Sequence, residues 1–167
     1  MKDYIDDTNY VKVEAEYRVI QNLKFGPKHN VLEQQIDTYK DHTKDDFLWA
    51  QEIENYKFDF YGNIIDRSEM TWLDLTRSTP MTYKVIHNDY DNLLARRKGN
   101  ATHTFASIYS TNTVLDLTTL IERQEIDNSA FDSRGNVADQ TIDKYVVEGG
   151  VEYLSSREAI KNLDIDA

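Results

Sequence analysis

The chain contains no cysteine, so disulfide bonds and thiol chemistry are excluded. Its first ten residues, MKDYIDDTNY, form no apolar core, and we therefore expect no secretory signal peptide. No hydrophobic run approaches the roughly 20 residues that a membrane-spanning helix requires. These absences predict a protein that is cytoplasmic when it is made and has no part in a membrane.

The sequence also lacks the motifs of known catalytic sites. Its glycines form neither GxGxxG nor a phosphate-binding loop, and there is no GxSxG or HExxH motif. The four histidines, His29, His42, His87 and His103, lie far apart in different predicted elements. We therefore expect no enzyme, no cofactor and no metal site.

Basic residues are few: there are 19 against 30 acidic ones, for a net charge of −11, and the acidic surplus is spread evenly. Because phosphate binding needs a concentrated positive face, we expect no direct nucleic-acid binding. The only basic cluster is Arg96, Arg97 and Lys98. It has two interpretations: the last turn of a short helix, where the helix dipole favours bases, or a contact with an acidic partner.

The chain contains one clear internal repeat. Residues 51–66 (QEIENYKFDFYGNIID) and 124–139 (QEIDNSAFDSRGNVAD) align without a gap, Gln51 on Gln124, and share nine of sixteen positions. The shared positions include a turn sequence, FDxxGN, in which Asp accepts backbone N–H groups and Gly supplies a positive φ. The predicted structural turns comprise Phe58, Asp59, Gly62 and Asn63 in the first copy, and Phe131, Asp132, Gly135 and Asn136 in the second.

A cation site is the alternative interpretation of the repeated turn. Asp59, Asn63 and Asp66 place oxygens at positions 1, 5 and 8 of the segment, as do their counterparts in the second copy. A calcium loop of the EF-hand kind needs oxygens at positions 1, 3, 5 and 12, with Gly at 6. This mismatch favours the structural turn.

The FDxxGN element resembles the YDxxGN element of the tyrosine–aspartate repeats in large bacterial toxins, with Phe in place of Tyr. The resemblance covers six residues per copy and recurs only once, at a much longer spacing than in those toxins. We carry no property of that family over to this chain.

Hydrophobic periodicity and turn signals predict both strands and helices. Thr43 followed by acidic residues resembles a helix start, and Ser155-Ser156-Arg157-Glu158 resembles a capping box. Gly149-Gly150 between apolar runs predicts a tight hairpin. The predicted strands are 10–23, 69–75, 81–87, 103–110, 141–148 and 151–154, and the predicted helices are 30–39, 43–55, 93–98, 113–123 and 155–167. Residues 30–39 also fit a strand: Leu32, Ile36 and Tyr39 suit a helix, whereas the corresponding residues of the second copy look extended.

Together these elements predict an α+β fold, mainly β, in a single compact domain of residues 1–167. Two tandem pseudo-repeats, approximately 10–80 and 81–154, would each contain a helix, an FDxxGN turn and a β-hairpin. A C-terminal helix over 155–167 would close the chain.

The first functional hypothesis is a non-enzymatic structural or assembly subunit of a large complex, with a homo-oligomer or ring as its form. Its most concrete version is a bacteriophage virion component of the neck, tail or capsid accessory ring. Its interface candidates are Arg96, Arg97, Lys98, Gln51 and Gln124. The alternative is an acidic inhibitor or immunity-type protein that blocks a basic surface such as a nuclease. A third hypothesis, a hydrolase or sugar-active enzyme, would require a concave pocket with His and paired acids.

Overall fold

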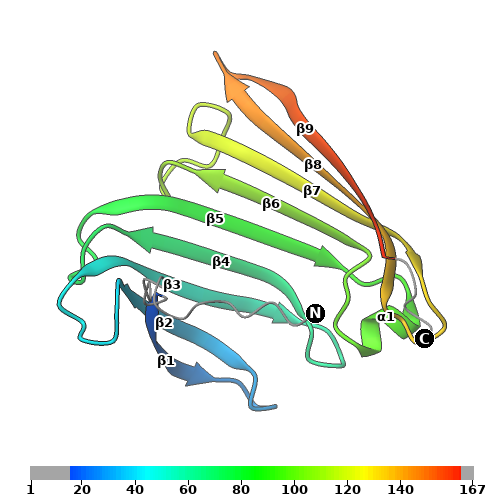
Figure 1. Ribbon diagram of the computed structural model, residues 1–167, viewed down its shortest axis with the longest axis horizontal. Coiled ribbons are helices and arrows are strands. Elements are labelled where there is room, and N and C mark those ends of the chain that lie inside the picture. Colours follow the sequence, from blue (N-terminus) through cyan, green and yellow to red (C-terminus); the bar gives the residue numbers. More distant parts are fainter. Residues whose placement is uncertain (1–15, 163–167) are drawn as a thin grey trace, which may run out of the picture.

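The computed structural model describes residues 16–162, which form one antiparallel sheet of nine strands in sequence order (Figure 1). Each strand pairs with the one before it and the one after it, as in a meander. The strands are β1 (Tyr17–Phe25), β2 (Val31–Tyr39), β3 (Phe47–Phe58), β4 (Ile64–Trp72), β5 (Pro80–Asp89), β6 (His103–Tyr109), β7 (Leu120–Phe131), β8 (Val137–Glu148) and β9 (Val151–Lys161).

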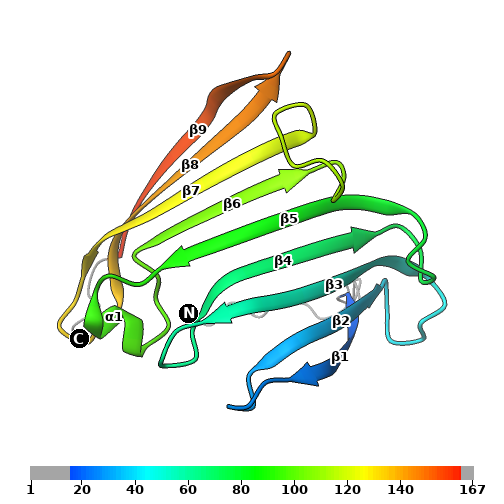
Figure 2. The ribbon, with the colours of Figure 1, turned by 180° about the vertical axis from the view of Figure 1, so that it is seen from behind.

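The sheet is a single twisted layer, and no other described element covers either of its faces (Figures 1 and 2). One short helix, α1 (Leu93–Arg97), lies in the connection between β5 and β6. No helix within residues 16–162 is long and apolar enough to span a membrane. The predicted α+β fold is therefore wrong: residues 16–162 form nearly all antiparallel β-sheet, with 62% strand and 3% helix.

Four of the five predicted helices are wrong. Residues 30–39 form β2, residues 43–55 form a loop and most of β3, residues 113–123 form a loop and the start of β7, and the C-terminal segment, as far as it is described, continues β9 to Lys161. The Thr43 signal belongs to a loop turn, because Thr43 donates from its backbone N–H and its hydroxyl to Asp41. Ser155 of the apparent capping box lies at a β-bulge.

A single layer explains why strands were mistaken for helices. A strand with one buried face alternates apolar and polar residues, and that alternation is the signal of a strand. Here both faces are partly exposed, so each strand carries mixed residues on both sides and the alternation is blurred. The elements with their own local signals are confirmed: β6, α1, and the hairpins β4–β5 and β8–β9. The predicted strand 10–23 is confirmed from Tyr17 onward, and its residues 10–15 lie outside the described residues.

The repeated segments form two equivalent hairpins, β3–β4 and β7–β8. In the first, Glu54 pairs with Ser68, and in the second, the residues aligned with them, Asp127 and Thr141, pair in the same way. Both hairpins carry bulges at the same two positions before the turn. The hairpin β1–β2 has this bulge pattern as well.

The structure reveals a shorter repeat than the predicted pseudo-repeats of 10–80 and 81–154. Each odd-numbered strand ends near an asparagine that has an isoleucine two positions before it. These asparagines are Asn22, Asn55, Asn88, Asn128 and Asn162, and the longest step between them, from Asn88 to Asn128, is the one that contains α1. The sheet is thus built from hairpin units, with β9 as the first strand of a fifth unit.

Few apolar side chains are buried, because a single layer has no interior. Among residues 16–162 the buried apolar residues are Tyr39, Ala50, Ile53, Met70, Ala95, Ala106 and Leu120. Backbone ladders and side-chain hydrogen bonds between neighbouring units therefore carry much of the structure.

Candidate functional site

The connections between strands lie at the two ends of the strands, on opposite sides of the sheet. We call these two rows of connections the turn edge and the loop edge; neither is an outer strand. The turn edge comprises residues 26–30, 59–63, 90–102 and 132–136, and the loop edge comprises residues 40–46, 73–79, 110–119 and 149–150. The predicted turns and the basic cluster all lie at the turn edge, near α1 (Figure 1). Gln51 and Gln124 lie within β3 and β7, away from it.

The two FDxxGN turns have the same hydrogen bonds. Asp59 Oδ1 accepts from the backbone N–H of Tyr61 at 2.8 Å and of Asn63 at 2.9 Å, and its other oxygen accepts from the Asn63 side chain. Asp132 accepts from the equivalent groups of Arg134 and Asn136 at 2.7–2.9 Å. Gly62 and Gly135 have φ values of 91° and 83°.

The two aspartates differ in their partners outside the turn. Arg96 Nε donates to Asp59 Oδ2 at 2.7 Å, which ties α1 to the first turn. Burial by itself would raise the pKa of Asp59, but the hydrogen bonds from Arg96 and Asn63 outweigh it and hold that pKa below its ordinary value. The carboxylate oxygens are therefore committed to the turn.

Neighbouring turns pack against one another along the turn edge. Asn63 Nδ2 donates to the carbonyl of Arg96 at 2.6 Å, and Asn100 Nδ2 donates to the carbonyl of Gly135 at 2.9 Å. A Cβ on Gly135 would lie 2.6 Å from backbone atoms of Leu94, so this close packing requires glycine. The turn edge is a continuous stack.

The predicted basic cluster is split by the structure. Arg96 is bound to Asp59, Lys98 Nζ donates to Asn136 Oδ1 at 3.1 Å, and Arg97 is exposed. Arg97 and Lys98 thus face solvent in part, beside exposed apolar side chains of the same edge. These apolar side chains are Phe60, which is 79% exposed, Leu93, which is 66% exposed, Tyr61 and Leu94.

The loop edge carries a second set of exposed apolar side chains: Leu73, Leu75, Val114, Leu115 and Leu117. Three of its four connections share a turn in which an aspartate accepts from a threonine two positions on. Asp41 accepts from Thr43, Asp74 from Thr76 and Asp116 from Thr118. Hydrogen bonds from the Thr76 hydroxyl and from Ser78 and Thr79 hold the pKa of Asp74 well below its ordinary range.

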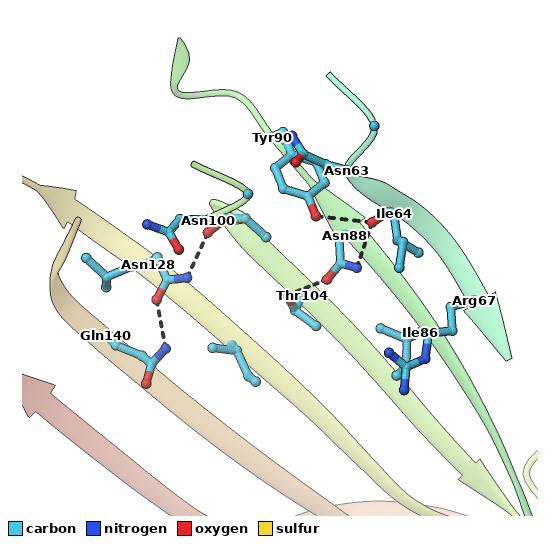
Figure 3. Close-up of a pocket in the computed structure, with 15 residues that line it drawn as sticks. Asn63, Ile64, Arg67, Ile86, Asn88, Tyr90, Asn100, Thr104, Asn128 and Gln140 are labelled. Atoms are coloured by element: carbon cyan, nitrogen blue, oxygen red, sulfur yellow. Dashed lines mark hydrogen bonds between the residues drawn. The ribbon is translucent and has the colours of Figure 1, made fainter. Parts of the chain in front are cut away.

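One face of the sheet, which we call the amide face, carries the recurring asparagines. All but the first donate to a main-chain carbonyl at the start of the preceding even-numbered strand or just before it. Figure 3 shows two of these asparagines, Asn88 and Asn128. The distances are 2.9 Å from Asn55 to Val31, 3.0 Å from Asn88 to Ile64, 2.7 Å from Asn128 to Ala101, and 3.0 Å from Asn162 to Val137. This ladder links every unit to the next.

The side-chain oxygens of these asparagines also accept hydrogen bonds. Asn88 Oδ1 accepts from Thr104 at 2.7 Å, and Asn128 Oδ1 accepts from Gln140 at 2.9 Å. The exception is the second unit: Asn55 Oδ1 has no hydrogen-bond partner among the described residues, and Arg67, opposite it, donates instead to Glu69.

A hollow of about 600 Å³ lies on the amide face between the β3–β4 and β7–β8 turns (Figure 3). Isoleucine, valine and alanine side chains line it together with Asn88, Asn128 and Gln140, whose amides already pair with protein groups. Among the described residues, Arg67 and Tyr90 are its only titratable side chains, and Tyr90 donates to the carbonyl of Ile64. No described carboxylate or imidazole lines the hollow for proton transfer.

The opposite face, which we call the charged face, carries most of the cross-strand ion pairs. His87 lies between two carboxylates, with Nδ1 2.5 Å from Asp66 and Nε2 3.2 Å from Asp89. The hydrogen bond with Asp66 raises the pKa of His87, and Asp89 adds to the effect. On the strand beside it, His103 Nδ1 lies 2.5 Å from Asp127. Within residues 16–162, no cluster of three or more His, Asp or Glu side chains could hold a metal ion.

Sequence reasoning found the turn-edge residues through the FDxxGN pattern but missed the loop edge and the asparagine ladder. The ladder has a readable signal, an Ile-x-Asn sequence that recurs once in every hairpin unit. Comparison with protein-family models, with curated proteins and with solved structures gave no match for this chain.

Proposed function

We propose that this chain is a non-enzymatic structural subunit that assembles with further copies into a larger complex. The observation that carries the proposal is the exposure of large apolar side chains at both edges of the sheet. Phe60 and Leu93 at the turn edge are among the most exposed apolar residues, and five more lie at the loop edge. Exposed apolar clusters on a folded protein mark contact surfaces, because their burial in a complex is favourable.

The chemistry of the two faces supports a role without catalysis. Active sites place activated acids, bases or nucleophiles in a concave pocket. The hollow on the amide face holds side-chain amides that are already paired, and the histidine–carboxylate group lies on the open charged face. Neither arrangement presents a nucleophile beside a base.

Charge pairing favours assembly over the acidic-inhibitor alternative. An inhibitor of a basic surface needs a face of unpaired carboxylates. On the charged face, Arg157 donates twice to Asp143 at 2.6 Å, and Arg123 donates to Glu152 at 2.9 and 3.1 Å. Asp143 and Glu152 are thus paired within the chain and are not free to bind a basic partner.

Light scattering coupled to size-exclusion chromatography, over a wide range of protein concentration, tests the assembly role. We expect the mass to rise above the 19.5 kDa of one chain as concentration increases. A single species of 19.5 kDa at every concentration would overturn the proposal.

A further inference from the structure

We infer that copies of this chain join head to tail, with the turn edge of one copy seated on the loop edge of the next. This inference rests on the proposed assembly role and names its interface. Because every odd-to-even connection lies at one edge and every even-to-odd connection at the other, the two surfaces face away from each other along the strand direction. One copy can therefore use both at once.

The two edges have opposite charge. Residues 26–30, 59–63, 90–102 and 132–136 contain five Lys or Arg and three Asp, whereas residues 40–46, 73–79, 110–119 and 149–150 contain three Lys or Arg and five Asp. The turn edge is thus the exception in a protein of net charge −11. Charge complementarity selects the partner and the orientation of a contact.

Pairing within the chain sharpens this contrast. Asp59 and Asp132 are buried in their own turns, with side-chain exposures of 1% and 4%, while Lys28, Arg97 and Lys98 are exposed. At the loop edge, Arg77 turns onto the charged face and donates to Asp37 at 2.7 Å. Asp45, Asp46 and Asp116 remain exposed there, beside the exposed bases Lys40 and Lys44. The accessible charge is therefore clearly positive at the turn edge and slightly negative at the loop edge.

Apolar side chains accompany both charge sets. The turn edge offers Phe60, Tyr61, Leu93 and Leu94, and Lys28 Nζ lies 4.8 Å from the Phe60 ring centre. The loop edge offers two Leu-Asp-Leu-Thr segments, 73–76 and 115–118, with exposed leucines on both sides of the aspartate. An aromatic and leucine cluster beside basic side chains complements leucines that alternate with aspartates.

The third hairpin unit supports a role for the turn edge beyond folding. The first, second and fourth units close with five residues between strands, whereas the third uses residues 90–102 and inserts α1 there. The other units show that folding does not require this insertion. It brings Leu93, Leu94, Arg97 and Lys98 to the surface, and insertions in repeat proteins often lie on the binding face.

A contact between unlike edges is heterologous, so it propagates as a ring where the rotation closes and as a filament where it does not. Such a contact makes a prediction that a contact between like edges does not make. A copy that is blocked only at its turn edge still offers a working loop edge, and a copy blocked at its loop edge still offers a working turn edge.

The experiment uses two variants of the full chain, F60S/L93S at the turn edge and L115S/L117S at the loop edge. We expect each variant alone to stay monomeric at concentrations where the unaltered chain assembles. Mixed in equal amounts, they should form a 1:1 dimer and nothing larger. The matched control is I20S, which removes an apolar side chain of 57% exposure on β1, outside both edges, and should leave assembly unchanged.

Below the concentration of assembly, circular dichroism and thermal melts should match the unaltered chain for all variants, because the replaced side chains are exposed. Assembly that persists in both variants, or mixtures that form no dimer, would overturn the head-to-tail contact while leaving the assembly role standing. An unaltered chain that never exceeds the monomer mass would overturn the assembly role itself. As a second readout, R97E should weaken assembly and reduce its dependence on salt.

Discussion

The asparagine side chains connect each hairpin unit of the sheet to the unit before it. From Asn55 onward, each amide donates to one neighbouring strand, and where its oxygen is paired it accepts from the other, as Asn128 does with Ala101 and Gln140. A hydrogen bond contributes only about 1 kcal/mol net, but an unpaired buried partner costs about 1–3 kcal/mol. Repetition of the ladder from unit to unit therefore makes it a main determinant of how the units stack.

Two glycines provide a matched test of how tightly the turns pack. Gly135 and Gly150 both have positive φ, of 83° and 79°, but only Gly135 has backbone atoms of Leu94 against its missing Cβ. We predict that Gly150→Ala lowers the free energy of unfolding by about 1–2 kcal/mol, the cost of placing Cβ in the left-handed region. Gly135→Ala should lower it by about 2–5 kcal/mol, because the turn must also move away from α1.

Urea denaturation of the two variants measures this difference directly. Equal losses of stability would show that the Gly135 turn and α1 separate without penalty, and the continuous stack of the turn edge would then be wrong.

His87 gives the charged face a dependence on pH. Its pKa is raised by Asp66 and Asp89, so the folded state binds its proton more tightly than the unfolded chain does. The stabilisation is fully present below the unfolded histidine pKa of about 6.5 and is lost as pH rises through the higher folded value. We predict that His87→Gln lowers the melting temperature more at pH 5.5 than at pH 8.5.

An NMR titration of the His87 ring should place its pKa above about 6.5 in the folded protein. Equal effects of His87→Gln at the two pH values, with a ring pKa no higher than that of a free histidine, would contradict the proposed pairing. Because the many carboxylates titrate in both the variant and the parent, comparing the two proteins at each pH removes the contribution of the carboxylates to the melting temperature.

At the level of strands and turns, the elements that could be predicted correctly are those in which single residues have a specific backbone role. The Asp-x-x-Gly-Asn turns could be identified because Asp59 and Gly62 have specific backbone tasks that few other residues perform. The first unit lacks this signal because Gly26 takes the position of the aspartate and His29, with φ of 61°, takes the position of the glycine. The turn of the first unit has the same backbone fold as the other turns, but its sequence does not contain the Asp-x-x-Gly-Asn pattern.

The false helices have a different origin. In β3, one face carries Trp49, Gln51, Ile53 and Asn55, so apolar and amide side chains share the side that a two-layer protein would fill with apolar residues alone. The spacing of apolar residues in this segment then fits a helix as well as it fits a strand. The lack of a second layer is a tertiary property, and short windows of sequence do not contain it.

The whole molecule is a row of units in which each strand contacts mainly its two neighbours. In such one-dimensional arrays, stability is a sum of unit and interface terms, so the ends open before the middle. At the two ends of the row, β1 and β9 each lack a described neighbour on one side. The side chains of β9 are largely exposed, and its Arg157 pair with Asp143 is one of its few side-chain anchors.

We therefore predict a gradient in native-state hydrogen exchange. Backbone amides of β4, β5, β6 and β7 should exchange most slowly, those of β1 and β9 fastest, and the remaining strands in between. Arg157→Ala should speed the exchange of β9 and leave β4 and β5 unchanged, because the lost ion pair holds only the outer strand.

The same hydrogen-exchange measurement distinguishes a free chain from an assembled one. Strand-edge pairing between copies would protect β1 or β9, whereas head-to-tail contact would slow exchange in the loops of the turn edge and the loop edge and leave the outer strands fast. Measuring exchange below and above the concentration of assembly therefore tests the direction of association without any substitution. Protection that appears first in β9 would replace the head-to-tail arrangement with a continuous sheet across two copies.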